Sequence, residues 1–331
     1  MSIFGFPNAV GLKEDEQNLG LLDQRLGLEW IRDNIASFGG DPERITMWGQ
    51  SAGSQATDYY NFAYPEDPIV AGFIMHSGTA QLSFPNLDVE QTNFTSVAKH
   101  FGCSNSCAET QIDCLRSINA SSIMAFMKTS SETATTSIVF SPITDERTNF
   151  ANYTTRAKAG NFSRLPAIIG TTANEGVSFF PFETNGPNQT EADAVTLGLF
   201  LCPTVLTTRE RYAANATTFR YLYAGNFSNI APRAWEGAYH SSDLPLVFGT
   251  YNMARGNATA FEKEVSEKMQ DFWLAFAEDP VNGLPKMGWE KYKNGTGEAA
   301  LLAYDGVVLQ GTEESMLEAM CSGVPLMSHH M

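Results

Sequence analysis

The chain has 331 residues, of which 43% are hydrophobic and 18% are charged, so it can bury a large core as one big domain or two small ones. Its formal net charge is -16 and no basic patch stands out, which argues against nucleic acid as a partner. We interpret the acidity as serving solubility, and no stretch approaches the ~20 apolar residues of a membrane span.

The order of elements along the chain predicts an α/β fold. Apolar residues at helical spacing run from Leu22 to Phe38, and Gly39-Gly40 stops this helix. A β-prone run at 44–48 is followed by helix-compatible residues at 52–60. Further strands are expected at 69–75, 165–170, 218–223 and 299–309, a long amphipathic helix at 261–276 and a short helix at 313–320. Because strands alternate with helices, we expect a mostly parallel central sheet flanked by helices.

A Gly-x-Ser-x-Gly motif lies between the first predicted strand and the helix after it. It reads Gly49, Gln50, Ser51, Ala52 and Gly53. Strand, tight turn and helix are what a nucleophile elbow requires, with small residues on either side allowing a close approach of strand and helix. The helix N-terminus also favours developing negative charge. The alternative is a serine in an ordinary turn.

An acid and a histidine follow later strands in the order that such a nucleophile needs. Glu175 lies in the loop after the strand at 165–170, and His240 lies in the segment after the strand at 218–223. Function in such sheets sits at the carboxyl ends of strands. A serine hydroxyl needs an imidazole to take its proton, and the imidazole needs a carboxylate to fix its tautomer. Ser51, Glu175 and His240 are therefore the predicted triad.

The other histidines are weaker candidates for the base. His100 sits in a polar stretch, and the pair at 329–330 lies in the terminal tail and is too small to argue for a metal. His76 follows an apolar run and is either a core histidine or a supporting group. Taken alone, His240 could be a surface histidine and Glu175 a helix N-terminal acid, so it is their order and position that favour the triad.

Sequons for N-glycosylation are more frequent than chance, which predicts about three in a chain of this composition. Nine are present, at Asn93, Asn119, Asn152, Asn161, Asn188, Asn215, Asn226, Asn257 and Asn294. A glycosylated secretory protein is the natural interpretation. The first residues show neither a basic region nor a long apolar core, so no signal peptide is recognised, and we expect the beginning of the protein to be missing.

The cysteines agree with an oxidising compartment. There are five, and none of their spacings matches a metal site, so no metal and no cofactor are expected. In an oxidising compartment they would pair, and an odd number leaves one over.

These segments together resemble the cholinesterase and type-B carboxylesterase family, from residue 3 to about 322. The helix and elbow signature runs over 36 residues as NLGLLDQRLGLEWIRDNIASFGGDPERITMWGQSAG. GTTANEG is similar to the family's acid loop and GAYHSSDLPLVFG to its histidine segment. The short matches CLR and LCP lie at 114–116 and 201–203.

The resemblance implies an α/β-hydrolase fold as a single, incomplete domain over 1–331, with its N-terminal strands missing. It implies a triad of Ser51, Glu175 and His240, with the Ala52 amide as one oxyanion donor and Ser77 supporting the acid. It also implies two disulfides, Cys103–Cys114 and Cys202–Cys321, which leave Cys107 unpaired.

The sequence departs from the family pattern in two places. The family's N-terminal segment carries the signal peptide, the first strands, another disulfide and a Gly-Gly loop with further oxyanion amides, and no equivalent of that loop is found here. Each lost oxyanion donor typically costs ~2.7–4 kcal/mol of transition-state stabilisation. We also expect the strand before Ser51 to be unpaired on one side. In addition, Glu175 and His240 are only 65 positions apart (240 − 175), and the deficit falls before Cys202.

The sequence therefore predicts a secreted, glycosylated serine carboxylesterase acting on a small-molecule or lipid ester, without nucleic acid or a membrane span. Phe179 and Phe180 are expected either to line an apolar acyl pocket or to be ordinary core aromatics. An acyltransferase with the same triad, an inactive fragment and a non-catalytic adhesion-type homologue are the alternatives. A fragment of this kind is expected to be insoluble or molten by itself.

Overall fold

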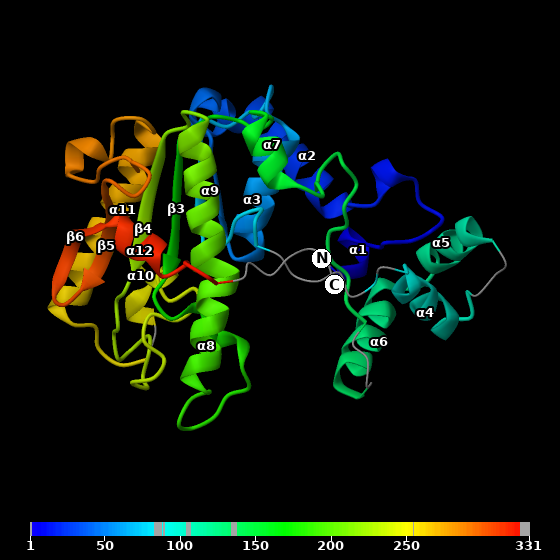
Figure 1. The fold of residues 1–331 in the computed structure, drawn as a ribbon. Helices are drawn as coiled ribbons and strands as arrows, with labels where there is room; N and C mark the ends of the chain where they lie inside the picture. The colour runs from blue at the N-terminus through cyan, green and yellow to red at the C-terminus, as the bar shows by residue number, and fades with distance from the viewer. Residues whose placement is uncertain are drawn as a thin grey trace. The chain divides into compact units, whose positions relative to one another are not determined.

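A computed structural model describes residues 2–82, 88, 90–103, 107–133, 138–253 and 255–324 of the chain. Its contacts divide the chain into two compact units, shown in Figure 1. The first comprises 1–30, 84–151 and 329–331, and the second comprises 31–83 and 152–328. The single domain expected over 1–331 stays a prediction, and each unit is described by itself.

The second unit holds the sheet. Its strands are β1 (Thr46–Gln50), β2 (Gly72–His76), β3 (Ala167–Thr172), β4 (Thr218–Tyr223), β5 (Glu298–Tyr304) and β6 (Val307–Glu313). Its α-helices are α3 (Ala52–Ala63), α7 (Tyr153–Lys158), α8 (Gln189–Val195), α9 (Cys202–Ala213), α10 (Leu244–Val247), α11 (Ala260–Glu278) and α12 (Glu314–Ala319). A π-helix, η5 (Thr196–Leu201), joins α8 to α9, and short 3-10 helices are η2 (Ile35–Phe38), η3 (Pro42–Arg44), η4 (Glu175–Phe179), η6 (Tyr251–Met253) and η7 (Pro285–Met287).

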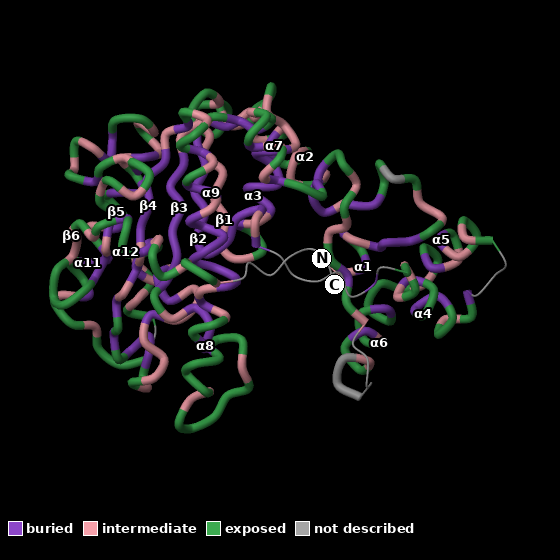
Figure 2. The backbone as a smooth tube through the Cα atoms, viewed as in Figure 1, coloured by how far each residue is buried: buried purple, intermediate pink, exposed green. Residues whose placement is uncertain are grey.

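The strands form one sheet in the order β1-β2-β3-β4-β5-β6 within the described part of the chain. The pairs from β1 to β5 are parallel, so the predicted mostly parallel α/β sheet is confirmed. β1 lies at the edge of this sheet and all five of its residues are only partly buried, whereas β2 and β3 are buried throughout. Figure 2 shows this contrast along the sheet. Among the described residues, the strand that leads into Ser51 is thus paired on one side only, as expected.

Alternating side chains of β4 show how the two faces of the sheet are covered. Phe219, Tyr221 and Tyr223 belong to the core cluster that contains the buried stripe of α11. The neighbouring Thr218 points the other way and accepts a hydrogen bond from Arg211 on α9. Because successive strand residues face opposite sides, α9 and α11 cover opposite faces. The helix predicted at 261–276 is therefore confirmed as a core helix.

The last predicted strand, 299–309, is wrong as a single element. The structure has a hairpin in its place, in which β5 and β6 pair antiparallel around Asp305 and Gly306. Both turn residues have positive φ, 48° and 76°. Asp-Gly is a strong signal for a two-residue hairpin turn, because both positions need this left-handed conformation. The short helix predicted at 313–320 is confirmed as α12.

The first unit consists of helices. They are α1 (Ser2–Gly5), η1 (Glu14–Glu16), α4 (Thr92–His100), α5 (Ala108–Arg116) and α6 (Ala120–Thr133), and α2 (Leu19–Asn34) begins in this unit. Phe94, Val97, Ile112, Leu115 and Ile123 belong to its apolar core. The helix predicted from Leu22 to Phe38 corresponds to α2 and η2, and Gly39 ends it with a φ of 83°. 

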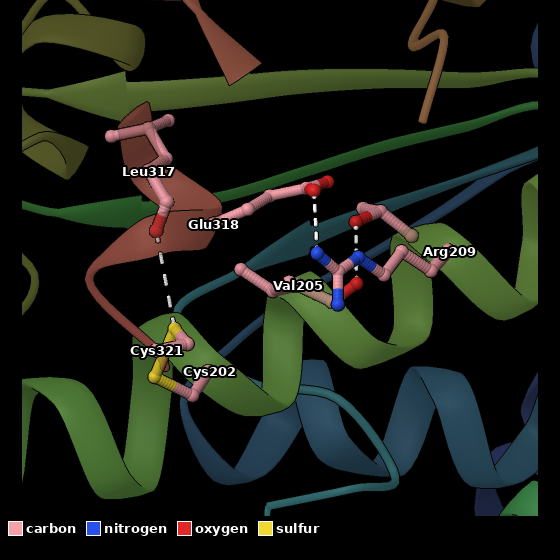
Figure 3. The surroundings of a disulfide bond; sticks show 7 residues. Cys202, Val205, Arg209, Leu317, Glu318 and Cys321 are labelled. Atoms are coloured by element: carbon pink, nitrogen blue, oxygen red, sulfur yellow. Dashed lines mark hydrogen bonds and ion pairs between the residues drawn. A yellow bond between two sulfur atoms is a disulfide. The ribbon is translucent and has the colours of Figure 1, made fainter. Parts of the chain in front are cut away.

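Both predicted disulfides are present. Cys103–Cys114 closes a short loop in the first unit, and Cys202–Cys321 joins the start of α9 to the residues after α12. Cys107 is free and exposed. Beside the second disulfide, Arg209 and Glu318 form an ion pair at 2.6 Å between the same two segments (Figure 3).

Candidate active site

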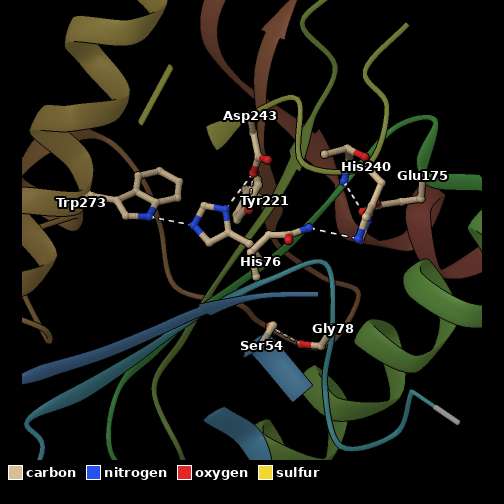
Figure 4. Close-up of polar contacts among 10 residues, drawn as sticks. Ser54, His76, Gly78, Glu175, Tyr221, His240, Asp243 and Trp273 are labelled. Atoms are coloured by element: carbon tan, nitrogen blue, oxygen red, sulfur yellow. Dashed lines mark hydrogen bonds and ion pairs between the residues drawn. The ribbon is translucent and has the colours of Figure 1, made fainter. Parts of the chain in front are cut away.

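The turn between β1 and α3 holds Ser51 in an uncommon backbone conformation. Its φ is 56° and its ψ is -122°, outside the regions that non-glycine residues usually occupy. Such a residue costs on the order of 1–3 kcal/mol and needs firm surroundings. The Ser51 amide donates to the His76 carbonyl at 2.8 Å, and Ser54 Oγ donates to the Gly78 carbonyl at 2.6 Å. Figure 4 shows the second contact. These bonds tie the elbow to the segment that follows β2.

The two glycines of the motif have different surroundings. A Cβ added to Gly49 would lie 2.1 Å from the Gly53 carbonyl oxygen, so strand and helix approach as closely as expected there. A Cβ added to Gly53 would meet no atom within 4 Å in the described structure. The close approach is thus confirmed for Gly49 and is not seen for Gly53.

We expect Gly49→Ala to destabilise the second unit, because its methyl group would collide with backbone that cannot move without opening the elbow. Gly53→Ala is the matched control and should be neutral or stabilising by about 0.5–1 kcal/mol, as for glycine inside a helix. Thermal unfolding of both variants measures the difference. Equal melting temperatures for the two variants would contradict this account of the elbow.

Glu175 is fully buried at the start of η4, just after β3. Its Oε1 accepts a hydrogen bond from the Thr172 amide at 2.7 Å, and its Oε2 lies 2.5 Å from Nδ1 of His240. A carboxylate can only accept, so Nδ1 carries the proton in this contact. The structure thus brings two of the three predicted triad residues together (Figure 4).

The acid loop and the histidine loop are also joined through their backbones. The Asn174 amide donates to the Ala238 carbonyl at 2.9 Å, and Asn174 forms a parallel bridge with Tyr239. The Asn174 side chain donates to the carbonyls of Trp235 and Glu236. Because these bonds flank Glu175 and His240 directly, the distance between the two side chains is set by the backbone as well.

The other ring nitrogen of His240 faces the elbow. Gln50, the residue before Ser51, places its Nε2 3.1 Å from His240 Nε2. With the proton on Nδ1, Nε2 is an acceptor and the Gln50 amide donates to it. Among the described residues no hydrogen bond joins Ser51 Oγ to His240. The role of Ser51 as the third member of the triad therefore stays a prediction.

Two further predicted site residues lie beside the elbow. Ala52 is the first residue of α3, where an amide has no acceptor within its own helix. Ser77 is fully buried with a φ of 54°, and its amide donates to the Gly170 carbonyl. Its hydroxyl has no hydrogen-bond partner within the described structure. The predicted support of Glu175 by Ser77 is therefore not seen as a direct contact.

A buried polar network lies next to the histidine loop. His76 was expected to be a core histidine or a supporting group, but its partner Asp243 was not predicted. His76 at the end of β2 is fully buried, with Nδ1 2.7 Å from Asp243 and Nε2 accepting from Trp273 on α11 at 2.9 Å. Tyr221 on β4 donates to the same Asp243 oxygen at 3.0 Å. Burial by itself would raise the pKa of the Asp243 carboxyl, but His76 and Tyr221 hold that pKa below its usual value.

Aromatic rings flank His240 on the side of the acid loop. Phe179 has its ring centre 5.2 Å from the imidazole and is 43% exposed, and Phe200 lies 4.9 Å from it and is buried. The two phenyl rings are 5.4 Å apart. Phe179 therefore faces the site instead of the core, Phe180 is half-buried, and Phe200 joins the wall without having been predicted.

Sequence reasoning missed Gln50, Phe200 and Asp243. Gln50 is adjacent to the motif serine, and Asp243 lies three residues after His240, so proximity in the sequence was an available signal for both. Phe200 comes from a distant helical segment and offered no such signal. The histidines at 329–330 lie outside the described residues.

The chain was compared with known proteins. The model of the carboxylesterase family matches residues 1–197 and 188–319, and these ranges overlap at 188–197, between Glu175 and Cys202. A secreted lipase 5 of Gibberella zeae is 43% identical over an alignment of 311 residues, which covers 88% of this chain and 58% of the relative. A chlorogenic acid esterase of Aspergillus niger is 40% identical over 97% of this chain and 65% of the relative. An acetylcholinesterase of Bungarus fasciatus is 26% identical, over 87% and 57% of the two chains.

The chain thus spans less than two thirds of the length of these relatives. The family match covers most of this chain, from residue 1 to the end of α12. Together with the parallel sheet and the elbow at the end of β1, this match shows that the chain belongs to the carboxylesterase family.

Proposed function

We propose that this protein hydrolyses carboxylic esters through Ser51, His240 and Glu175. The observation that carries the proposal is the contact of 2.5 Å between Glu175 Oε2 and His240 Nδ1. It leaves Nε2 of the imidazole free of a proton and directed toward the residue next to Ser51. An imidazole of this tautomer, oriented by a buried carboxylate, is the general base that a serine nucleophile needs.

In the proposed reaction, His240 Nε2 takes the proton of the Ser51 hydroxyl as Oγ attacks the ester carbonyl. Glu175 stabilises the imidazolium that forms, and the Ala52 amide at the start of α3 donates to the oxyanion. His240 then returns the proton to the departing alcohol, which leaves an acyl-enzyme. Water, deprotonated by the same imidazole, then attacks the acyl carbonyl. The bond to Ser51 Oγ breaks, His240 returns the proton to Oγ, and the acid is released.

The aromatic wall supports an apolar or aromatic acyl group as the preferred substrate portion. Phe179 and Phe200 present ring surface beside His240, where the acyl chain of an ester bound at Ser51 would lie. Rings of this size favour flat or apolar groups through burial and stacking. Relatives named chlorogenic acid esterase and secreted lipase indicate phenolic and lipid esters as the substrate classes to compare.

The acceptor of the acyl group separates a hydrolase from an acyltransferase. The test is to incubate the 331-residue chain with a p-nitrophenyl ester, with and without an added alcohol, and to identify the products. Free carboxylic acid as the main product supports hydrolysis. Transfer of the acyl group mainly to the added alcohol would support the acyltransferase, and no release of p-nitrophenol in either mixture would contradict both.

We also propose that the protein is secreted and glycosylated. Relatives named as secreted proteins and the two disulfides support an extracellular location. Within the described residues, no helix has the length and apolar character needed to cross a membrane. Eight of the nine sequon asparagines are exposed, namely Asn119, Asn152, Asn161, Asn188, Asn215, Asn226, Asn257 and Asn294. 

We expect Asn93 to carry the least glycan of the nine sequons. It is half-buried, and its Nδ2, the atom to which a glycan is attached, donates to the Val139 carbonyl at 2.9 Å. Asn119 and Asn152 instead use Oδ1 to accept helix amides, which leaves Nδ2 accessible. Peptide mapping after enzymatic removal of glycans in ¹⁸O-labelled water measures the occupancy of each site. Full occupancy at Asn93 would contradict this ranking.

A further inference from the structure

In the buried network around His76, the donor and the acceptor of each hydrogen bond can be assigned. The indole nitrogen of Trp273 can only donate, so His76 Nε2 accepts and bears no proton. The proton of His76 is therefore on Nδ1 and is donated to Asp243 Oδ2, 2.7 Å away. Tyr221 donates its hydroxyl proton to the same oxygen. Figure 4 shows the resulting chain from Trp273 through His76 to Asp243.

In the described structure, one oxygen of the carboxylate in this network has no partner. His76 and Tyr221 both donate to Oδ2 of Asp243, whereas Oδ1 accepts no hydrogen bond there. Both His76 and Asp243 are fully buried. Burying an ionised group is expensive, and well-packed apolar side chains of similar volume often give equal or better stability. Stability alone is therefore a poor explanation of Asp243.

The position of Asp243 offers a better explanation, because a tight turn connects it to His240. Ser241 has a positive φ of 75°, and the Ser242 amide donates to the Tyr239 carbonyl at 2.9 Å. The Asp243 carbonyl then accepts from the first turn of α10. The Asp243 side chain thus fixes one end of this turn against β2 and β4, while Glu175 fixes the imidazole at the other end.

We propose that Asp243, held by His76 and Tyr221, is a positioning residue that sets the place of the His240 imidazole relative to Ser51. The proposal rests on the function proposed above. His240 needs two constraints, because the Glu175 contact fixes the ring's orientation and its Nδ1 proton but not the path of the backbone that carries it. Asp243, three positions after His240, supplies the second constraint by fixing the backbone of the turn that carries the imidazole.

The variants that test this differ in what they keep. Asp243→Asn retains an acceptor oxygen for His76 and Tyr221 and removes the charge. Asp243→Leu retains similar volume and removes the acceptor. Asp271→Asn, on the exposed side of α11, is the control for the loss of one carboxylate. Trp273→Phe removes the donor to His76 and keeps an aromatic ring, smaller than the indole, in the core, and it serves as the second test if Asp243→Leu does not fold.

The measurement is the rate at which a fluorophosphonate probe labels Ser51, together with the melting temperature of each variant. Misplacement of a catalytic group by about 1 Å can cost about 100-fold, so we expect Asp243→Leu to label about 10- to 100-fold more slowly. Asp243→Asn should recover most of the rate, and Asp271→Asn should match the unchanged chain. If Asp243→Leu is folded and labels at the unchanged rate, or if Trp273→Phe does so where Asp243→Leu is unfolded, the proposal is wrong.

A second readout separates this proposal from the proposed function. The proton between His240 and Glu175 should give a downfield proton NMR signal, assigned by its loss in Glu175→Gln. A shift or broadening of that signal in folded Asp243→Leu, but not in Asp243→Asn, supports the positioning role even if labelling proves independent of Ser51. An unchanged signal in Asp243→Leu contradicts it. Labelling that persists in Ser51→Ala contradicts the proposed function alone.

Discussion

Ser51→Ala is expected to abolish covalent labelling by a fluorophosphonate and to lower ester hydrolysis by about 10⁶-fold, the loss typical of a removed triad nucleophile. The reason is that, in the described part of the chain, Ser51 is the hydroxyl-bearing residue held at the end of β1, with a φ of 56°. Mass spectrometry of the labelled chain and hydrolysis of a p-nitrophenyl ester measure the two effects.

The control for this variant is Ser178→Ala, which removes an exposed serine of η4 close to the same site. It should label and hydrolyse like the unchanged chain. If Ser51→Ala binds as many probe molecules per chain as the unchanged protein, and at the same rate, another nucleophile reacts. The assignment of Ser51 would then be wrong.

Glu175→Gln extends the same experiment to the acid. The amide keeps the size of the carboxylate but offers a nitrogen or a neutral oxygen to His240 Nδ1, so neither the tautomer nor the imidazolium is stabilised as before. Replacement of a triad acid by its amide typically costs about 10⁴-fold. We therefore expect a loss that is large but smaller than that of Ser51→Ala. A loss below tenfold would show that Glu175 does not orient the base.

The candidate site could be assembled from the sequence because its parts lie at strand ends. Ser51 follows β1, Glu175 follows β3 and His240 follows β4, and parallel strands bring their carboxyl ends to one edge of a sheet. Short apolar runs bounded by turn residues marked those strands. The close contact of Glu175 with His240 follows from this geometry, although the sequence could not give its distance.

Which strands pair, and which buried side chains meet, was harder to predict than the helices and strands themselves. A single strand was expected at 299–309 because apolar residues stand on both sides of its Asp-Gly pair, and that pair was not recognised as a hairpin turn. The same difficulty hid the polar network, since His76 and Asp243 are 167 positions apart. Periodicity tells which residues are buried, but not which buried polar groups meet.

Eight α-helices of the described residues, α1 and α4 to α10, were not predicted, and the sequence of α9 shows why. α9 has the composition CPTVLTTRERYA, with a threonine-rich stretch that is typical of strands as much as of helices. Its helical state is imposed by packing against β3 and β4 and by the disulfide at its first residue. Tertiary contacts decided the structure of such segments against weak local propensity.

The disulfide Cys202–Cys321 is expected to contribute more to stability than Cys103–Cys114. It joins residues 119 positions apart, whereas the other joins residues 11 positions apart. By chain entropy a closed loop of about 100 residues stabilises by about 4.7 kcal/mol and one of about 15 residues by about 3 kcal/mol. Chemical denaturation of the two double alanine variants measures the difference, and a smaller loss for Cys202→Ala/Cys321→Ala would contradict the expectation.

The location of the larger loop adds a functional consequence. It contains His240, Asp243 and Trp273, whereas Ser51 and Glu175 lie outside it. Removing the disulfide therefore loosens the segment that carries the proposed base. The elbow and the acid, which lie outside the loop, are not affected directly. Labelling of Ser51 should fall in Cys202→Ala/Cys321→Ala at temperatures well below its unfolding transition. The Cys103→Ala/Cys114→Ala variant should keep the unchanged rate, because its loop belongs to the other compact unit.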